Sequence, residues 1–386
     1  MTHETSAPAP GAAQTPTCQL LARQAADYRG WWWVGPPRDP WLESGQGVAI
    51  SADLAVRAAW QAAGRPAHSP FEPLPLDPQL AGDEEAPKGA VLFWPKSHAL
   101  GEWWLLWLCA TLPEGTPLQL VGENQGGIKR VLKVLAALGL GCRKLDSARR
   151  CSLFETRLGP VGIDPDAAWT AFEVEPDGER LLLASHPGVF GHGKLDDGTR
   201  LLLETLCGAL PPGEGRASGD GPGEGLGAVF GDVLDMGCGD GILAAWLARR
   251  GAAVTAVDVN AFAVEATRRT LAANGLAGEA LFGEALSGET LESDVYSALA
   301  GRTFDAIVSN PPFHQERAID YGPAARLILE APAHLKPGGQ LFLVANAFLP
   351  YPDLLERAFG GFEILADDRR FRAYRAISPG RDSRSR

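Results

Sequence analysis

The tetrapeptide Asn310-Pro311-Pro312-Phe313 has the residue types that can hold a planar amine for chemistry. It follows the apolar run 304–309, which predicts a buried strand, so the tetrapeptide would lie at that strand's carboxyl end. The Asn310 side chain and the Pro311 carbonyl can accept hydrogen bonds from an exocyclic NH2, and Phe313 can stack on the ring that carries it. Because prolines also serve simply to end a strand, a catalytic role for the tetrapeptide needs a second signal.

A glycine-rich loop, DMGCGDG at 235–241, supplies that second signal. The residues before it predict a short buried strand, and those after it predict a helix over 242–250. A second strand, over 253–257, ends in Asp258, which lies 23 residues after Asp235. Nucleotide-binding folds place a carboxylate for ribose hydroxyls at about that spacing.

The glycine spacing indicates which nucleotide would bind. Glycines allow a close approach between backbone and ligand. The pattern is Gly-x-Gly-x-Gly with an acid just before it, and not the Gly-x-Gly-x-x-Gly of a dinucleotide fold, so it favours S-adenosylmethionine over NAD. The cofactor is expected to contact Asp235, Gly237, Cys238, Gly239, Gly241, Asp258 and Asn310.

Length and composition limit the class of protein. The chain has 386 residues, enough for two domains, and 45% of them are hydrophobic. It has no run of about 18 apolar residues, and its first seventeen residues are polar and proline-rich, so we expect a soluble cytoplasmic protein with a disordered tail and no signal peptide. Its six cysteines show no metal-ligand spacing, so we expect reduced thiols and no metal.

Charge is distributed unevenly along the chain. The net charge of −12 argues against a nucleic-acid substrate, but residues 129–157 carry a local charge of +6, and residues 369–386 contain seven arginines and one acid. Such clusters are consistent with RNA contacts and equally with solvated helix faces and a loose tail.

The first half of the chain contains an echo of the second. The segment LQLVGENQGG at 118–127 resembles a strand, a glycine turn and a helix start, and Arg143 to Asp146 resembles a second strand that ends in an acid. We expect this echo to match the unit over 233–258. Because it lacks the glycine spacing and no Asn-Pro-Pro follows it, we interpret the first half as a methyltransferase-like fold that has lost its active site.

The order of these motifs resembles a class I S-adenosylmethionine-dependent methyltransferase that modifies amino nitrogens. Several longer strings narrow the resemblance to the small-subunit (16S) ribosomal RNA guanine-N2 methyltransferases of the RsmC type. The strings are FWPKS (93–97), LVGENQGGIK (120–129), KLDSARRC (144–151), PGVFGHGKLDDGTRLLL (187–203), TLAANGLAGE (270–279), SNPPFH (309–314) and VANAFLPYPDLLE (344–356).

The resemblance implies a fold, a reaction and further site residues. The fold would be α/β, with two tandem Rossmann-like methyltransferase domains of which the N-terminal one is degenerate. Methyl transfer would go from S-adenosylmethionine to the N2 amine of a guanine in ribosomal RNA or the small ribosomal subunit. By family position, Glu284 would contact the adenine after a third strand over 279–282. Expected substrate contacts are Lys96, Lys129, Arg130, Arg149, Arg150, Phe348 and Tyr351.

The expected organisation has five parts. A disordered tail (1–17) precedes a degenerate domain (18–185), which is a possible RNA-binding domain. The catalytic domain (186–378) includes a flexible glycine-rich insert (211–228), and a basic tail (379–386) follows.

Other functions remain open from the sequence. Enzymes that methylate a large-subunit RNA guanine, a DNA adenine or a protein glutamine also use Asn-Pro-Pro followed by an aromatic residue. A non-catalytic RNA-binding protein of ribosome assembly would share the fold and the basic clusters.

Overall fold

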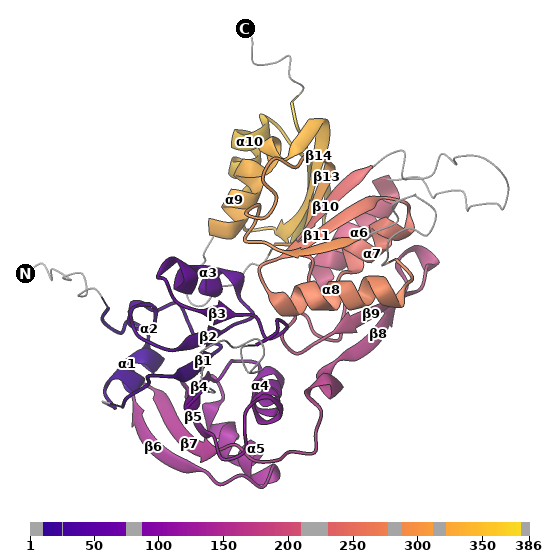
Figure 1. Ribbon diagram of the computed structural model, residues 1–386. Helices are drawn as coiled ribbons and strands as arrows, with labels where there is room; N and C mark the ends of the chain where they lie inside the picture. The colour runs from indigo at the N-terminus through magenta and orange to yellow at the C-terminus, as the bar shows by residue number, and fades with distance from the viewer. Residues whose placement is uncertain are drawn as a thin grey trace, which may run out of the picture. The chain divides into compact units, whose positions relative to one another are not determined.

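The computed structural model describes residues 11–24, 26–74, 87–209, 231–276, 288–311 and 322–379. The chain divides into two compact units, Met1–Ala168 and Trp169–Arg386, each an α/β fold around a mixed sheet (Figure 1). The boundary predicted after residue 185 differs from this division by one β-hairpin. That hairpin belongs to the second unit because Leu181 and Leu183 are buried in the second unit's core.

The first unit contains a seven-stranded sheet in its described residues, in the order β3-β2-β1-β4-β5-β7-β6. Its strands are β1 (Trp31–Val34), β2 (Val48–Ile50), β3 (Ala67–His68), β4 (Gly89–Phe93), β5 (Pro117–Glu123), β6 (Arg143–Ala148) and β7 (Cys151–Arg157). Its helices are α1 (Pro16–Ala22), α2 (Pro40–Ser44), α3 (Leu54–Ala62), α4 (His98–Thr111) and α5 (Val131–Ala137), with 3-10 turns at Ile128–Arg130 and Pro165–Ala168. The first five strands in the order are parallel to one another. Strand β7 runs antiparallel to β5, and β6 runs antiparallel to β7.

The second unit begins with the hairpin β8 (Thr170–Val174) and β9 (Leu181–Ser185), and then forms a sheet in the order β12-β11-β10-β13-β14-β16-β15. Its strands are β10 (Asp232–Met236), β11 (Ala253–Asp258), β12 (Glu289–Glu292), β13 (Phe304–Ser309), β14 (Leu335–Asn346), β15 (Glu363–Asp367) and β16 (Phe371–Ile377). Its helices are α6 (Asp197–Ala209), α7 (Ile242–Arg249), α8 (Ala261–Ala273), α9 (Gly322–Glu330) and α10 (Tyr351–Phe359), with 3-10 turns at Pro176–Gly178 and Ala331–Ala333.

The two sheets have the same strand order, 3-2-1-4-5-7-6 when each is numbered along its own unit, so the predicted tandem duplication is confirmed. The predicted correspondence between this echo and residues 233–258 is wrong. Segment 118–127 contains β5, the counterpart of β14, and Arg143 to Asp146 lies in β6, the counterpart of β15. The counterpart of the glycine-loop strand β10 is β1.

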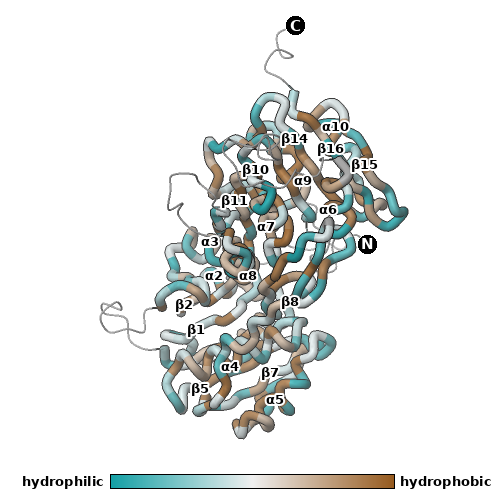
Figure 2. Tube along the Cα trace, turned by 90° about the vertical axis from the view of Figure 1, so that its right-hand side faces the viewer, coloured by the Kyte–Doolittle hydropathy of each residue, from teal (hydrophilic) through white to brown (hydrophobic). Residues whose placement is uncertain are grey.

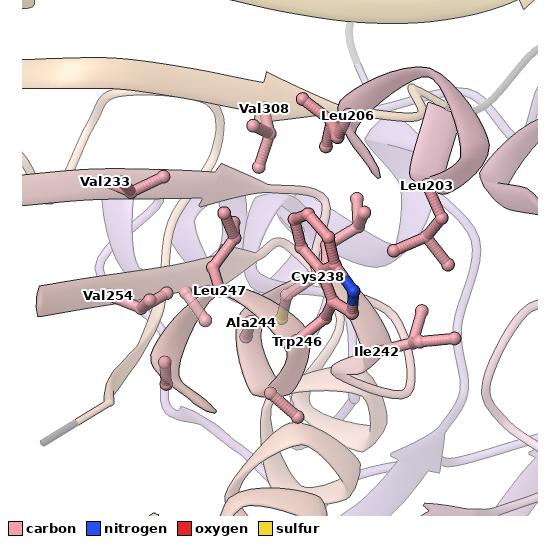
Figure 3. Packing of buried hydrophobic residues seen from close by; sticks show 14 of the residues in the cluster. Leu203, Leu206, Val233, Cys238, Ile242, Ala244, Trp246, Leu247, Val254 and Val308 are labelled. Carbon is pink, nitrogen blue, oxygen red and sulfur yellow. The ribbon is translucent and has the colours of Figure 1, made fainter. Parts of the chain in front are cut away.

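The core of the second unit follows from its sequence pattern. Central strands contain buried apolar runs, such as residues 341–345 of β14, as expected for strands covered on both faces (Figure 2). Below the glycine loop, Trp246 of α7 fills the space between the sheet and α6, and Leu206 of α6 lies beside Val308 of β13 (Figure 3). Helix α6 as a whole packs on β14 and β16, and its start is tied to the end of β13 by hydrogen bonds of Asn310.

The start of the chain is more ordered than its composition predicts. Helix α1 begins at Pro16, and the backbone N–H groups of Gln14 and Thr15 donate to the buried carboxylate of Asp39. The predicted tail over 1–17 is therefore wrong for 11–17, because Asp39 supplies an acceptor that composition does not reveal. Residues 1–10 and the predicted segments 211–228 and 380–386 lie outside the described residues.

Candidate active site

The glycine loop connects β10 to α7 at the carboxyl edge of the second sheet. Gly237, Gly239 and Gly241 have φ angles of 79°, 58° and 81°, a region that residues with a Cβ rarely adopt. A Cβ at Gly237 or Gly239 would meet nothing within 4 Å, whereas one at Gly241 would come within 2.8 Å of the Thr267 backbone. The first two glycines therefore keep a space open above the loop, and the third permits close approach of α7 and α8.

Two aspartates hold this loop in place. The Asp235 carboxylate is fully buried and accepts a hydrogen bond from the Ala244 N–H in the first turn of α7 at 3.0 Å. Asp258, at the end of β11, accepts from the N–H groups of Gly239 at 3.3 Å and Asn260 at 2.9 Å. Asp235 thus shapes the loop from beneath, while Asp258 lies at its rim.

Three carboxyl groups near the glycine loop have no basic partner among the described residues. Within the described ranges, Asp196, Asp235 and Asp240 form no ion pair with a basic side chain. Burial raises the pKa of Asp235 to about 8 and that of Asp240 to about 7, and neighbouring carboxylates add to both shifts. A positive charge beside Asp235 or Asp240 would favour the ionised form of that carboxyl group.

Cys238 contributes to the loop through its backbone. Its side chain is 5% exposed and packs in the apolar cluster under the loop, and burial raises its thiol pKa well above the ordinary value (Figure 3). A protonated thiol in that position is unreactive.

Asn310 follows β13, the neighbour of β10 in the sheet, and so lies beside the glycine loop. The pairing of Met236 with Ser309, and the hydrogen bond from Ser309 Oγ to the Met236 carbonyl at 2.7 Å, align the two strand ends. Asn310 Nδ2 donates to Asp196 Oδ2 at 2.8 Å and to Thr199 Oγ1 at 2.7 Å. Asn310 Oδ1 is buried and accepts no hydrogen bond from any described residue. Sequence reasoning missed Asp196 and Thr199, although both lie in the family-like string 187–203.

Several expected site residues fall outside the described residues, namely Pro312, Phe313 and Glu284, together with the strand expected over 279–282. The structure does describe a third strand in the order of the sheet, β12, which pairs with β11 through Asp258 and Glu292. Two polar residues follow β12: Ser293, which is buried, and Asp294, whose carboxylate pairs with Arg326 at 2.6 Å.

The two rings expected near the substrate differ in exposure. Phe348, just beyond β14, is 71% exposed, so it is available to contact a base. Tyr351, at the start of α10, is 1% exposed and belongs to the core cluster that contains Leu355 and Tyr374. The packing of α10 against the sheet accounts for its position, and Phe348 is the better placed of the two.

The basic residues predicted as RNA contacts gather at one edge of the first unit. Lys96 follows β4, and the pair Lys129 and Arg130 lies in the turn after β5. Arg149 and Arg150 form the turn between β6 and β7, which lies at the carboxyl end of β5 because Cys151 pairs with Glu123. All five side chains are exposed. These predicted contacts therefore lie at the carboxyl edge of the first sheet. In the second sheet, the equivalent edge carries the glycine loop.

The corresponding site of the first unit is closed. Trp94 occupies the position after β4 that Asn310 occupies after β13, and it is 7% exposed. A Cβ on Gly101 would come within 2.6 Å of the Trp94 ring, so the indole fills the space there. After β1 the chain continues as Gly35-Pro36-Pro37, and prolines have no N–H to offer a ligand.

No group of His, Cys, Asp or Glu among the described residues could hold a metal ion, and the six cysteines are free thiols. In the described part of the chain, no helix is both long and apolar enough to cross a membrane.

Comparisons with known proteins agree with this geometry. The methyltransferase small domain family matches residues 180–375, and the N-terminal domain of that family matches residues 49–169. The ribosomal RNA small subunit methyltransferase C of Chromohalobacter salexigens is 60% identical over 369 residues, which cover 96% of this chain and 99% of that relative. The protein of the same name from Pseudomonas aeruginosa (strain LESB58) is 45% identical and covers 85% of this chain and 93% of its own length.

A solved structure is similar over both units. The T. thermophilus 16S rRNA N2 methyltransferase (RsmC), in complex with AdoMet and guanosine, aligns with a TM-score of 0.75 at 27% identity. The alignment covers 95% of this chain and 92% of that one.

Proposed function

Because this chain belongs to the ribosomal RNA small subunit methyltransferase C family, we propose that it transfers a methyl group from S-adenosylmethionine to the N2 amine of a guanine in 16S ribosomal RNA. The observation that carries this proposal most strongly is the buried, unpartnered Oδ1 of Asn310 beside an open glycine loop. The relatives and the guanosine-bound structure support the choice of substrate. We propose a cytoplasmic location, because the ribosomal RNA substrate would be found there.

The loop residues fit S-adenosylmethionine. The cofactor carries a sulfonium and an ammonium group, and such a positive charge would favour ionisation of Asp235 and Asp240, whose pKa values burial raises. Gly237 and Gly239 leave room for the methionine and ribose, and Asp258 is placed to accept from the ribose hydroxyls. Asp294, at the end of β12, would meet the adenine edge, and Glu284 stays a second candidate.

The chemistry needs orientation more than a strong catalyst. The bound cofactor supplies a methyl group already activated by its sulfonium. The protein must hold the guanine amine in line with that methyl group. Asn310 Oδ1 and the Pro311 carbonyl would each accept one N2 hydrogen, which fixes the nitrogen and favours electron density on it. Pro312 and Phe313 complete the proposed motif, with the Phe313 ring against the base.

Both units would contact the RNA. Phe348 stands exposed beyond β14, where it could stack on the target base or its neighbour. The exposed cations of the first unit, Lys96, Lys129, Arg130, Arg149 and Arg150, would hold the RNA backbone through phosphate contacts. The first unit would then bind RNA while the second performs the transfer.

Transfer of labelled methyl from S-adenosylmethionine to small ribosomal subunits and to protein-free 16S RNA tests the proposal. The intact protein should label RNA, and Asn310→Ala should lower kcat by about 10²–10³-fold while the cofactor still binds. Asn274→Ala, which removes an amide at the end of α8 that bonds to Leu182, controls for lost stability and should retain turnover. Label on protein alone would refute the RNA substrate.

A further inference from the structure

The orientation of the Asn310 amide is set by two residues at the start of α6. We propose that Asp196 and Thr199 are positioning residues that hold Asn310 with its oxygen toward the target amine. This inference rests on the proposed function, since it concerns the group that accepts the amine. The residues lie more than a hundred positions from Asn310 in the chain.

The chemistry of the contact determines which way the amide points. An ionised carboxylate can only accept hydrogen bonds, so Asp196 Oδ2, at 2.8 Å, requires a donor from Asn310. The Thr199 hydroxyl accepts the second proton of the same NH2 at 2.7 Å. The flipped amide would place Oδ1 against the carboxylate, which electrostatics disfavours. Both protons of Nδ2 are therefore committed, and Oδ1 is the atom left to accept.

Local structure holds Asp196 itself in place. Its Oδ2 also accepts from the Thr199 N–H at 3.1 Å, and its carbonyl accepts from the Arg200 N–H at 2.9 Å, so it caps α6. A Cβ at Gly198 would come within 3.1 Å of Asp196 Oδ2 and 3.4 Å of Asn310 Oδ1. Glycine at 198 thus lets the helix start close around the amide.

The orientation decides whether Asn310 helps or hinders the reaction. A guanine N2 amine presents two N–H donors, which Oδ1 can accept. A flipped Asn310 would present its own NH2 to them, donor against donor. Loss of the Asp196 contact should therefore lower turnover and leave the cofactor contacts at the glycine loop unchanged.

Three variants separate positioning from helix capping. Asp196→Ser retains a good N-cap but is too short to reach Asn310, so kcat should fall by about tenfold or more while the cofactor KM and the melting temperature stay close to wild type. Asn310→Asp places two carboxylates in contact and should nearly abolish turnover. Adding Asp196→Asn to Asn310→Asp restores a donor–acceptor pair with the roles exchanged, and should raise kcat by about tenfold over the single variant.

Wild-type kcat in Asp196→Ser, or no recovery in the double variant, would overturn the positioning role. A signature that is independent of activity is the side-chain amide of Asn310 in NMR spectra of the full protein. Its two protons should be protected from solvent exchange in wild type and not in Asp196→Ser. If wild type shows this protection but transfers no methyl to RNA, the proposed function fails and the positioning contact stands.

A second inference comes from two matching turns. The hairpins β6–β7 and β15–β16 occupy the same place in the two sheets, and each turn contains adjacent arginines, Arg149-Arg150 and Arg369-Arg370. Three of the four have left-handed backbone angles, with φ of 51° at Arg149, 63° at Arg150 and 73° at Arg369. Turns of this kind favour Asn or Gly, and strained backbone in bulkier residues is typical of functional positions.

The second turn lies beside the catalytic edge. Asn346, at the end of β14, pairs with Phe371, and the Arg370 guanidinium contacts Asp197 at 2.7 Å, next to Asp196. We infer that the Arg369-Arg370 turn is an RNA phosphate site that holds the strand near the target guanine, as the Arg149-Arg150 turn would hold RNA on the first unit. Arginine suits this role because its planar fork matches phosphate oxygens.

Arg369→Gly gives this inference a distinctive test. Glycine relieves the φ of 73°, so the variant should have a melting temperature equal to or above that of wild type. Its affinity for small ribosomal subunits should nevertheless fall about three- to tenfold, with a smaller salt dependence, while S-adenosylmethionine binding stays unchanged. Unaltered RNA affinity and salt dependence would overturn the inference.

Discussion

The carboxyl groups of the glycine loop make cofactor binding depend on pH in a calculable way. Burial raises the pKa of Asp240 to about 7, so at pH 5.5 this group is almost entirely protonated in the free protein. A sulfonium ligand binds more tightly to the ionised form. Below the pKa each pH unit then costs about 1.4 kcal/mol of ionisation, equivalent to about tenfold in affinity per proton released.

The expected change in affinity determines the pH range of the assay. Between pH 5.5 and 6.5 the affinity for S-adenosylmethionine should rise about tenfold, a range below the titration of the ligand's own amine at about 7.7–8.0. Isothermal titration calorimetry at each pH gives the Kd, and repeating it in buffers of different ionisation enthalpy counts the protons released. Asp240→Asn removes one of the two loop carboxyl groups with a raised pKa, so the affinity of this variant should vary less than that of wild type over the same range. An affinity independent of pH in wild type, or an equal slope in Asp240→Asn, would refute this account of the loop's electrostatics.

Three further outcomes are expected. Gly239→Ala should weaken S-adenosylmethionine binding by tenfold or more and cost about 1–2 kcal/mol of stability from its φ of 58°, whereas Gly275→Ala, at φ 68° with open space around it, should cost similar stability and leave binding intact. Replacing both Arg149 and Arg150 by Ser should lower RNA affinity and reduce its salt dependence by about two phosphate contacts, measured by filter binding, with cofactor affinity unchanged. Burial raises the pKa of Asp235 from 3.8 to about 8, so between these two pH values the folded protein retains a proton that the unfolded chain has lost. The free energy of unfolding without cofactor should therefore fall as the pH rises from 3.8 to about 8. A free energy of unfolding that stays constant over this range in urea denaturation would contradict this.

Much of the catalytic unit could be predicted from local sequence. The strand at 304–309 is confirmed at its predicted bounds, and the glycine loop is followed by a helix as expected. Both succeed because the signal is local: an apolar run, positive-φ glycines and polar residues just beyond the strand end. The counterpart of β10 in the first unit was missed because β1 keeps its strand but not its loop, since Trp31 to Val34 lead into Gly35 and two prolines.

The partners of Asn310 show the limit of local patterns. Asp196 and Thr199 are ordinary helix-start residues in the sequence, and only the packing of α6 on β14 and β16 brings them to the amide. The same limit applies to the adenine edge. The strand expected over 279–282 lies outside the described residues, and sequence patterns did not indicate β12 at Glu289–Glu292, which is assigned by its pairing with β11.

The measurement that tests the central claim most directly is the identity of the methylated nucleoside. Small ribosomal subunits, or 16S RNA freed of protein, would be incubated with the intact enzyme and isotopically labelled S-adenosylmethionine, digested to nucleosides and analysed by mass spectrometry. We predict label in N2-methylguanosine at a single site, and labelling about 10²–10³-fold slower when Asn310→Ala replaces the intact enzyme. Label in another nucleoside, or undiminished N2-methylguanosine with Asn310→Ala, would contradict this prediction.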